Sequence, residues 1–522
     1  MVIGEIVERN LWRYPHKTAV CFEENRLSFE EFADRIYRLA NALRSLGLKK
    51  GDAVAFMLPH NMIEAQEIIF ALAVAGIIIV PLNARFSNEE ILHLISNCDV
   101  KGVIFEQTYN RLIESIRLSM KKVQILVSIG SSNNNDIYDY ETLILQSSHN
   151  PPDVAVREED IAALIHTSGT TGMPKEAIWT HKSWLAGSRD VVIKFQLTEK
   201  DNLLMFTPYF HIPFFWFNIA VSYMGGGLVF IRRPDPDLIL NAIEKEKITT
   251  VSHFVPTTLL RMLDFAELDR YDLSSLRWFM YGGAPMPLPI LERAIPKFGN
   301  KVIQLYGFTE LAGCATALPP EDHLLSGTDK EKRRMLSCGK EMPSSDIRIV
   351  NSEGTLVDQG EEGEIIYRSD NLMKGYWKNP EETANLLVDG WFHTGDVGFI
   401  DEDKCIYITG RKKDIIISGG ENITPKQVED VIYKHAAVEM AAVIGVPDDQ
   451  WGETVKAVVV LKKGMEATED EIIKLCKDKL AHYKAPRSVD FVQSLPVTHT
   501  GKIKRWELKK RYLVKKRGGV KK

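Results

Sequence analysis

The sequence predicts an α/β protein with parallel sheets and at least two domains. Segments with the apolar spacing of helices alternate with short apolar runs along the first part of the chain. This alternation is typical of strand–helix–strand units, in which consecutive strands run parallel. The chain also has 522 residues, which is longer than one hydrophobic core usually supports. Pattern and length together therefore indicate a multidomain α/β architecture.

Helices and strands are expected in turn along residues 28–105. Ser28 and Glu31 form a capping box, which predicts a helix from this point toward Gly47. A second helix is expected near residues 62–75, and a third begins at residues 88–90. The apolar runs that predict strands are residues 53–57, 77–81 and 103–105.

The composition is that of an ordinary globular protein, with 45% hydrophobic and 26% charged residues. A net charge of -5 argues against a dedicated nucleic-acid-binding protein. The segment from Gly501 onward is different, because eleven Lys and Arg residues accompany one acid, Glu507. We interpret this tail as a solvated segment, and contact with an anionic ligand or surface is the alternative.

Cysteine usage and the apolar segments predict a cytoplasmic protein without a transmembrane segment. The six cysteines are isolated, which fits a reducing compartment and argues against structural zinc. No signal peptide is expected at the N-terminus. Residues 68–84 are uncharged, but Gly76, Pro81 and Asn83 interrupt them, so a buried helix followed by a strand is expected.

A connecting loop, residues 130–156, is expected before the stretch that is most informative about function. This stretch, residues 167–175, follows a predicted strand and combines hydroxyls, glycines and a cation, namely Thr167, Ser168, Gly169, Thr170, Thr171, Gly172 and Lys175. Glycines allow backbone amides to turn toward one centre, while the hydroxyls and the lysine add donors and charge. We interpret it as a phosphate-binding loop, and an ordinary Ser/Thr/Gly turn is the alternative.

The loop differs from the common nucleotide-binding loop. That loop ends in Gly-Lys-Ser/Thr, whereas here Pro174 precedes Lys175 and Glu176 follows it. Residues 176–180 alternate in polarity and predict a returning strand, so no helix dipole is expected to help hold a phosphate. Other parts of the chain must therefore complete the site.

Two later stretches carry groups that suit a nucleotide. Residues 279–287 predict a strand that ends in bare backbone able to accept a flat heterocycle, at Gly282, Gly283 and Ala284, although a tight turn is the alternative. Residues 306–310 offer a ring, a close backbone approach, a hydroxyl and a carboxylate, on Tyr306, Gly307, Thr309 and Glu310. An acid near phosphates indicates Mg²⁺, which takes few protein ligands.

The last third of the chain adds an acid, a charged segment and a lysine. Asp396 follows a glycine, and an acid in such a turn can accept both hydroxyls of a ribose, although alone it is a weak signal. The four charges of residues 411–414 are interpreted as a solvated link between domains, and Gly419 with Gly420 indicates a close backbone approach. Lys502 is expected on a loop near the end.

Aromatic residues gather around His211, within residues 203–217. A lone histidine among aromatic rings is usually a packed residue with one hydrogen bond. The segment also fits the wall of an apolar pocket, and both interpretations stay open.

In this order, these stretches resemble the adenylate-forming superfamily of acyl-CoA synthetases, peptide-synthetase adenylation domains and beetle luciferases. The resemblance extends from about Leu27 to Arg505 and is most specific at residues 167–175, 306–310, 391–396, 410–429 and 496–502. It implies a large N-terminal domain, residues 1–411, of α/β subdomains with a small β-rich subdomain. It also implies a small mobile C-terminal α+β domain, residues 412–522, with a hinge near Lys413.

The resemblance further implies a two-step reaction. A carboxylic acid and ATP give an acyl-adenylate and pyrophosphate, and coenzyme A then displaces AMP. The obstacle in the first step is the repulsion between the carboxylate and the polyphosphate, which cations, oriented amides and Mg²⁺ offset. ATP, Mg²⁺, coenzyme A and a small carboxylic acid are therefore the expected ligands. The oligomeric state stays open, with a homodimer as one alternative.

Each matching residue inherits an expected role from this resemblance. Residues 167–175 would hold the β- and γ-phosphates, Thr309 would contact the α-phosphate, and Glu310 would bind Mg²⁺. The adenine would lie between Tyr306, with Gly307 beside it, and residues 282–284, while Asp396 and Arg411 would hold the ribose. Lys502 would bridge the acid and the α-phosphate. Rotation about Lys413 would bring Ser418, Gly419 and Gly420 to the pantetheine channel. His211 would stand at the entrance to the acyl pocket.

The acid itself is less defined. Amino-acid-activating relatives have an aspartate where this chain has His211, so an α-amino acid is not expected. Residues 214–217 and 255–256 predict an apolar acyl group. A medium- or long-chain fatty acid is the first hypothesis, and an aryl acid of the cinnamate or benzoate type is the alternative. A luciferase-like oxygenase and a carboxylate-binding pseudoenzyme are alternatives of other classes.

Glu176 departs from the resemblance, because the family usually has glycine directly after the lysine. A carboxylate near a polyphosphate would repel it by about 1 kcal/mol if it is solvated, and by more if it is desolvated. The cost is small if the side chain points away.

Overall fold

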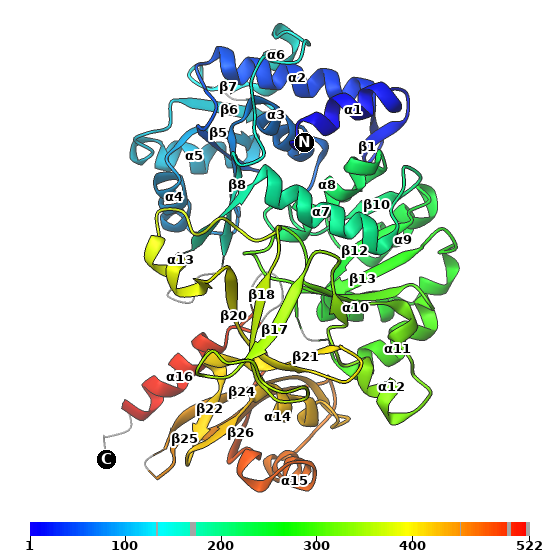
Figure 1. The fold of residues 1–522 in the computed structure, drawn as a ribbon, viewed down its shortest axis with the longest axis vertical. Helices are drawn as coiled ribbons and strands as arrows, with labels where there is room; N and C mark the ends of the chain where they lie inside the picture. The colour runs from blue at the N-terminus through cyan, green and yellow to red at the C-terminus, as the bar shows by residue number, and fades with distance from the viewer. Residues whose placement is uncertain (132–133, 168–173, 285, 449, 498–502, 518–522) are drawn as a thin grey trace.

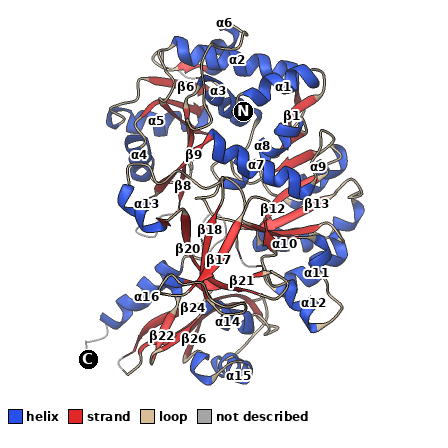
Figure 2. Ribbon diagram, in the orientation of Figure 1, coloured by secondary structure: helices blue, strands red, loops and turns tan. Residues whose placement is uncertain are grey.

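The structure is a computed structural model that describes residues 1–131, 134–167, 174–284, 286–448, 450–497 and 503–517. These residues form four β-sheets, which follow one another down the molecule in Figure 1 from the N-terminal half to the C-terminal helices. Figure 2 shows that helices surround the first two sheets, whereas the third sheet is mostly strand and turn. The observed α/β and α+β architecture confirms the predicted fold class.

The first sheet has the order β7-β6-β5-β3-β4-β8-β9, and its neighbouring strands are parallel except for the β8–β9 pair. Its strands are β3 (Ala53–Met57), β4 (Ile78–Pro81), β5 (Val100–Glu106), β6 (Ile125–Ile129), β7 (Tyr138–Asp139), β8 (Ile161–Thr167) and β9 (Lys175–Thr180). The helices that lie among them are α2 (Phe29–Ser45), α3 (Ile63–Ala75), α4 (Asn88–Asn97), α5 (Asn110–Ile116) and α6 (Tyr140–Gln146).

Local signals located most of these elements correctly. The capping box of Ser28 and Glu31 begins α2, and Gly76 ends α3 in the left-handed conformation that glycine adopts without strain. The expected connecting loop at residues 130–156 is wrong in part, because it contains β7 and α6. Tyr140 and Ile144 of α6 are buried, so tertiary packing stabilises a helix that is too short for a clear sequence signal.

The second sheet has the order β16-β15-β14-β13-β12-β10-β11-β1-β2. Its strands are β1 (Thr18–Phe22), β2 (Asn25–Ser28), β10 (Asn202–Met205), β11 (Gly227–Phe230), β12 (Thr250–Phe254), β13 (Trp278–Gly282), β14 (Val302–Tyr306), β15 (Thr316–Leu318) and β16 (Lys340–Glu341). Its helices are α1 (Glu5–Arg13), α7 (His181–Phe195), α8 (Ile212–Met224), α9 (Pro236–Lys245), α10 (Pro256–Leu263), α11 (Leu288–Phe298) and α12 (Asp329–Arg334). The run from β11 to β14 is parallel, so the carboxyl ends of these strands meet at one edge.

Two smaller sheets complete the chain. The third contains β17 (Asp346–Val350), β18 (Gly363–Arg368), β19 (Leu387–Val388), β20 (Trp391–Ile400) and β21 (Ile406–Arg411), with α13 (Pro380–Leu386) beside it. The fourth contains β22 (Ile416–Ser418), β23 (Glu421–Ile423), β24 (Val438–Asp448), β25 (Gly452–Leu461) and β26 (Ser488–Phe491), with α14 (Pro425–Ile432), α15 (Glu469–Lys479) and α16 (Arg505–Arg517).

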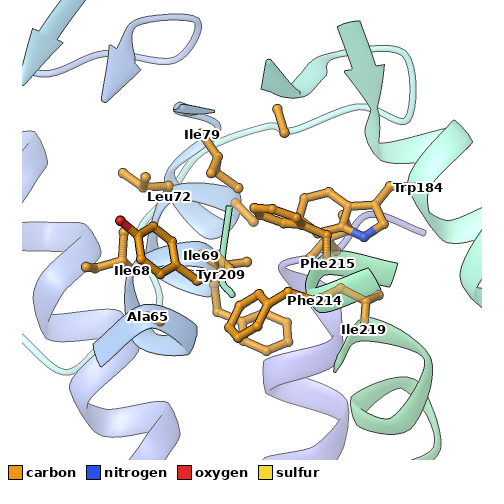
Figure 3. Close-up of a cluster of buried hydrophobic side chains, with 14 of the residues drawn as sticks. Ala65, Ile68, Ile69, Leu72, Ile79, Trp184, Tyr209, Phe214, Phe215 and Ile219 are labelled. Atoms are coloured by element: carbon orange, nitrogen blue, oxygen red, sulfur yellow. The ribbon is translucent and has the colours of Figure 1, made fainter. Parts of the chain in front are cut away.

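The main core joins the first two sheets. Side chains of α3 share this core with rings from α7 and α8, and Figure 3 shows Ile68 and Leu72 beside Tyr209, with Trp184 and Phe215 on the other side of the cluster. Burying these apolar side chains stabilises the folded state by about 25 cal/mol for each Å² of apolar surface removed from water. Within the described residues, no helix combines the length and the apolar character that crossing a membrane requires.

Candidate active site

Asp396 is the centre of a hydrogen-bonded cluster that three strands build. β20 and β21 are antiparallel, and Asp396 lies directly opposite Arg411, so the two side chains share a face of the sheet. Arg411 Nε lies 2.6 Å from Asp396 Oδ1, and Tyr306 Oη at the end of β14 donates to Oδ2 at 2.6 Å. Asp396 is only 3% exposed. Each carboxylate oxygen has two lone pairs, so the aspartate keeps further acceptor capacity.

The cluster keeps its partners in their donating forms. Burial, followed by the charge of Asp396, raises the pKa of Tyr306 well above its usual range. Burial by itself would lower the pKa of Arg411, but Asp396 and Tyr306 outweigh it, and the pKa ends above its usual value. At neutral pH the phenol is therefore protonated and the guanidinium charged.

Glu310 lies four residues after Tyr306 and is held by a residue from a distant part of the chain. Tyr376 Oη donates to Glu310 Oε1 at 2.5 Å, and the backbone amide of Met373 donates to the carbonyl of Glu310 at 2.8 Å. The carbonyl of Thr309 accepts from Trp179 Nε1 at 3.0 Å. These contacts fix the turn that presents the Glu310 carboxylate. Tyr376 occupies only one of the two oxygens of this carboxylate.

Lys175 reaches the same tyrosine from the other side. It is the first residue of β9, and its Nζ lies 5.8 Å from the centre of the Tyr376 ring. The ammonium also pairs with Glu382 Oε1 of α13 at 2.5 Å. Tyr376 therefore stands between the predicted phosphate-binding lysine and the predicted metal-binding acid.

A third cation, Lys413, belongs to the same electrostatic neighbourhood. Burial lowers its pKa, and the nearby charges of Arg411 and, more weakly, Lys175 lower it further. Asp414 and Asp396 oppose this lowering. Lys175 and Arg411 are each paired with an acid, Glu382 and Asp396, so Lys413 adds a positive charge that these two pairs do not neutralise.

The predicted heterocycle surface lies beside Tyr306. Gly282 pairs with Leu305 across β13 and β14, and Gly283 has a φ of +75°, a left-handed conformation that favours glycine. A Cβ on Gly282 would lie 2.3 Å from the Leu305 carbonyl and 2.9 Å from the imidazole of His253. These contacts require glycine at position 282, because β14 packs closely against its backbone. The role of residues 282–284 as an adenine surface stays a prediction. Gly307 is less confined, because a Cβ there would lie 3.2 Å from the Cα of Cys314.

His211 lies at the N-cap of α8, beyond the carboxyl end of β10. β10 is two strands from β13 in the same parallel sheet, so His211 and Gly282 lie toward the same edge. Its ring is 4.7 Å from that of Phe210, which in turn lies 6.5 Å from His166 at the end of β8. This ring set connects the first two sheets.

The interpretation of Phe214, Phe215, Trp216 and Phe217 as a pocket wall is wrong. Their exposed fractions are 0%, 0%, 2% and 0%, and Phe215 packs edge-on against Trp179 and Trp184. A side chain that lines a pocket keeps accessible surface, whereas these rings fill the core between α7 and α8. The composition of the segment could not separate the two cases, since both need apolar rings.

Some predicted residues lie elsewhere or outside the described chain. Thr167 pairs with Lys175 at the mouth of the β8–β9 hairpin. Ser168, Gly169, Thr170, Thr171, Gly172 and Lys502 lie outside the described residues. Ser418, Gly419 and Gly420 form the β22–β23 turn of the fourth sheet, where a Cβ on Gly419 would lie 2.6 Å from the Trp451 ring. That turn belongs to the C-terminal domain rather than to the Asp396 cluster.

Glu176 points away from the site. Successive residues of a strand face opposite sides of the sheet, so Lys175 and Glu176 diverge. Glu176 is 2% exposed, and its Oε2 accepts from Asn97 Nδ2 at 2.7 Å. Burial raises its pKa to about 7. The expected repulsion of a polyphosphate is therefore small, as anticipated for a side chain on the opposite face.

Sequence reasoning missed Tyr376 and Glu382. Both lie in residues 371–386, between two recognised motifs, and neither residue type indicates a site by itself. The only available signal was an aromatic residue directly after Gly375. Their role depends on contacts with Glu310 and Lys175, which are distant in the sequence.

Comparison with known proteins agrees with this geometry. Residues 7–377 match the AMP-binding enzyme family, and residues 427–502 match the AMP-binding enzyme C-terminal domain. Feruloyl-CoA synthase of Amycolatopsis sp is 35% identical, over 95% of this chain and 96% of the relative. Long-chain-fatty-acid–CoA ligase of Bacillus subtilis is 34% identical, over 95% and 92% respectively. The crystal structure of ATP-bound MatB from Rhodopseudomonas palustris has a TM-score of 0.88 at 29% identity. The match covers 98% of this chain and 99% of MatB. The chain therefore belongs to the adenylate-forming family of AMP-binding enzymes, among the AMP-forming acid–CoA ligases.

Proposed function

We propose that this enzyme uses ATP to convert a carboxylic acid into an acyl-adenylate and then transfers the acyl group to coenzyme A. The observation that carries the proposal is the cluster of Asp396 with Arg411 and Tyr306, together with the contacts of Tyr376 with Glu310 and Lys175. ATP and coenzyme A as co-substrates are supported by the ATP-bound relative and by the CoA ligases among the relatives.

The described side chains suit the parts of ATP in turn. Asp396 is held by Arg411 and Tyr306 and can still accept hydrogen bonds, which suits the two hydroxyls of a ribose. The bare backbone of residues 282–284 beside Tyr306 suits the adenine. Lys175 begins β9 and follows the hydroxyl- and glycine-rich stretch in the sequence, so its charge suits the β- and γ-phosphates. The roles of Thr309, Ser168–Gly172 and Lys502 remain those that the family implies.

Glu310 fits a magnesium ion that ATP brings with it. Among the described residues, no group of three or more His, Cys, Asp or Glu side chains could hold a metal. Mg²⁺ at phosphates usually needs only one or two carboxylates, and Tyr376 occupies only Oε1 of Glu310. Glu310 would hold the ion through its other oxygen, and the ion would supply positive charge to the polyphosphate.

We also propose the domain division at residues 411 and 412, with Lys413 as the hinge. Lys412 pairs with Glu364 of β18 at 3.0 Å, whereas Asp414 pairs with Arg505 of α16 at 4.0 Å. The residues on the two sides of Lys413 are thus anchored to different domains. A hinge at this position would let the Ser418–Gly420 turn and residues 498–502 exchange places at the site, as a two-step reaction needs.

For the acid, the structure changes the order of the hypotheses. The argument for a fatty acid used the rings of residues 214–217, and those rings lie in the core. The rings of Phe210 and His211 are tilted against each other and do not define an aryl slot, so the aryl acid is supported by the feruloyl-CoA relative. A medium- or long-chain fatty acid is the second candidate, supported by the Bacillus subtilis relative.

A panel of acids tests this proposal. Pyrophosphate release by the full chain with MgATP is measured with ferulate, benzoate, octanoate, hexadecanoate and acetate, and thioester formation with coenzyme A is measured by mass spectrometry. We expect the highest kcat/KM with an aryl acid and conversion of that acid to its CoA thioester. A preference for hexadecanoate would replace the aryl proposal by the fatty-acid one. No pyrophosphate release with any acid would contradict the ligase and support a carboxylate-binding pseudoenzyme. Adenylate formation without thioester, with light emission and oxygen consumption, would support a luciferase-like oxygenase.

A further inference from the structure

Glu176 has a buried carboxyl group that the proposed reaction does not use. It shares its face of β9 with Ile178, toward the apolar cluster that contains Leu164 and Cys98. Burying a carboxyl group is costly unless hydrogen bonds compensate. In the described chain, Oε1 of Glu176 has no hydrogen-bond partner, and Oε2 has one, the side-chain amide of Asn97. An apolar residue would pack there at lower cost, so the carboxyl group calls for a function.

Asn97 connects three parts of the fold. It is the last residue of α4, and its side chain donates to Glu176 of β9 at 2.7 Å. Its backbone carbonyl accepts from Trp377 Nε1 at 2.9 Å and from Lys378 Nζ at 2.7 Å. The Glu176–Asn97 hydrogen bond therefore ties β9 to α4 and, through α4, to residues 374–378.

Residues 374–378 also run along β9 directly. Ala177 and Tyr376 form an antiparallel bridge, and the amide of Trp377 donates to the carbonyl of Glu176 at 2.8 Å. Neighbouring side chains on this segment alternate as they do in a strand. Trp377 lies on the side of Glu176 and contacts Asn97, whereas Tyr376 lies on the side of Lys175 and contacts Glu310.

We propose that Glu176 is a positioning residue for MgATP binding, which holds Lys175 and Tyr376 in register through its hydrogen bond to Asn97. The inference rests on the proposed function, because that function gives Lys175 and Glu310 their ligand. Loss of the bond removes the link through α4 and leaves the register of β9 and residues 374–378 to their backbone hydrogen bonds alone. Lys175 and the Tyr376–Glu310 pair are then held less closely for the polyphosphate and its ion.

The hydrogen bond needs an acceptor at Oε2 and not a charge. Glutamine at position 176 keeps that acceptor, whereas alanine removes it. Asn97→Ala removes the donor and leaves Glu176 in place. Ile178→Ala is the matched packing control, because it removes apolar volume from the same face of the same strand and leaves the Asn97 contact intact.

The experiment is calorimetric titration of the full chain with MgATP, without acid or coenzyme A. We expect Glu176→Ala and Asn97→Ala each to weaken MgATP binding about fivefold to tenfold, and the double variant to bind no more weakly than either. Glu176→Gln is expected to bind within about twofold of the wild type, and Ile178→Ala likewise. If Glu176→Ala does not fold, Asn97→Ala and Glu176→Gln decide the question by themselves.

Other results overturn the inference. These are unchanged affinity in Asn97→Ala, losses in the two alanine variants that add in the double variant, or a loss in Ile178→Ala as large as theirs. If Glu176→Gln loses as much MgATP affinity as Asn97→Ala, the Glu176–Asn97 hydrogen bond does not need only an acceptor, and the inference is also contradicted. Because binding is measured without acid, failure to activate any acid refutes the proposed function and leaves this result standing. Ligase activity with equal MgATP affinity in all variants refutes the inference alone.

Discussion

Replacing Glu176 with glutamine is expected to raise the free energy of unfolding at about pH 8 by about 3 kcal/mol and to leave it nearly unchanged at about pH 4. Burial raises the pKa of Glu176 from its ordinary value of 4.5 to about 7. Each pKa unit corresponds to about 1.4 kcal/mol, so a shift of about 2.5 units gives about 3 kcal/mol. The side chain is 2% exposed, so solvent screens this effect little.

The sign follows from which state holds the proton. Between about pH 4.5 and pH 7 the unfolded chain loses the proton of Glu176, whereas the folded chain keeps it. The stability contributed by the buried acid is therefore complete below pH 4.5 and is lost as the pH rises through 7. Glutamine does not titrate, so the variant lacks this loss. The titratable and charged groups near Glu176 on the neighbouring elements are His166 on β8, Cys98 after α4, and Lys378.

The assay is denaturant unfolding of both proteins, followed by tryptophan fluorescence at several pH values from about 4.5 to about 8.5. Glu159→Gln, at an exposed position, is the control for a general effect of charge removal. A stability difference between Glu176→Gln and wild type that stays constant over this range refutes the reasoning, because it means that Glu176 ionises alike in the folded and unfolded chains.

Four further variants test the site and the core. Asp396→Asn is expected to weaken MgATP binding at least tenfold, because it removes the negative charge that orders Arg411 and would accept from the ribose. Titration calorimetry measures the affinity, and an unchanged value contradicts the role of Asp396. Tyr376→Phe should lower pyrophosphate release about fivefold to tenfold through loss of its bond to Glu310, with an unchanged circular dichroism spectrum. Lys502→Ala should slow adenylate formation about a hundredfold while a supplied acyl-adenylate still reacts with coenzyme A, and equal loss of both steps would overturn its role. Phe215→Ala should cost about 3–5 kcal/mol of stability, measured by denaturant unfolding, because the ring is fully buried between Trp179 and Trp184; a cost below about 1 kcal/mol contradicts its place in the core.

Local physics made much of the fold predictable. The capping box at Ser28, the glycine stop at Gly76 and the antiparallel pairing of β8 with β9 depend on residues within a short stretch of the chain. The motifs of the site were readable for the same reason, since glycines, acids and hydroxyls identify a nucleotide surface through short stretches such as residues 306–310. The resemblance of their order to one family then implied a common site, and the structure joins Tyr306, Asp396 and Arg411 as expected.

Position in space decided what the sequence left open. The same rings at residues 214–217 could line a pocket or fill a core, and only the packing of α7 against α8 put them in the core. Tyr376 carried no signal, because its importance comes from Glu310 and Lys175, which are far away along the chain. By itself the sequence determined most of the elements and the family, and it predicted which groups handle phosphate and ribose, because short-range geometry and residue chemistry suffice for these. The tertiary structure alone decided which groups touch and that Glu176 is buried behind the site, because those outcomes depend on contacts between distant segments.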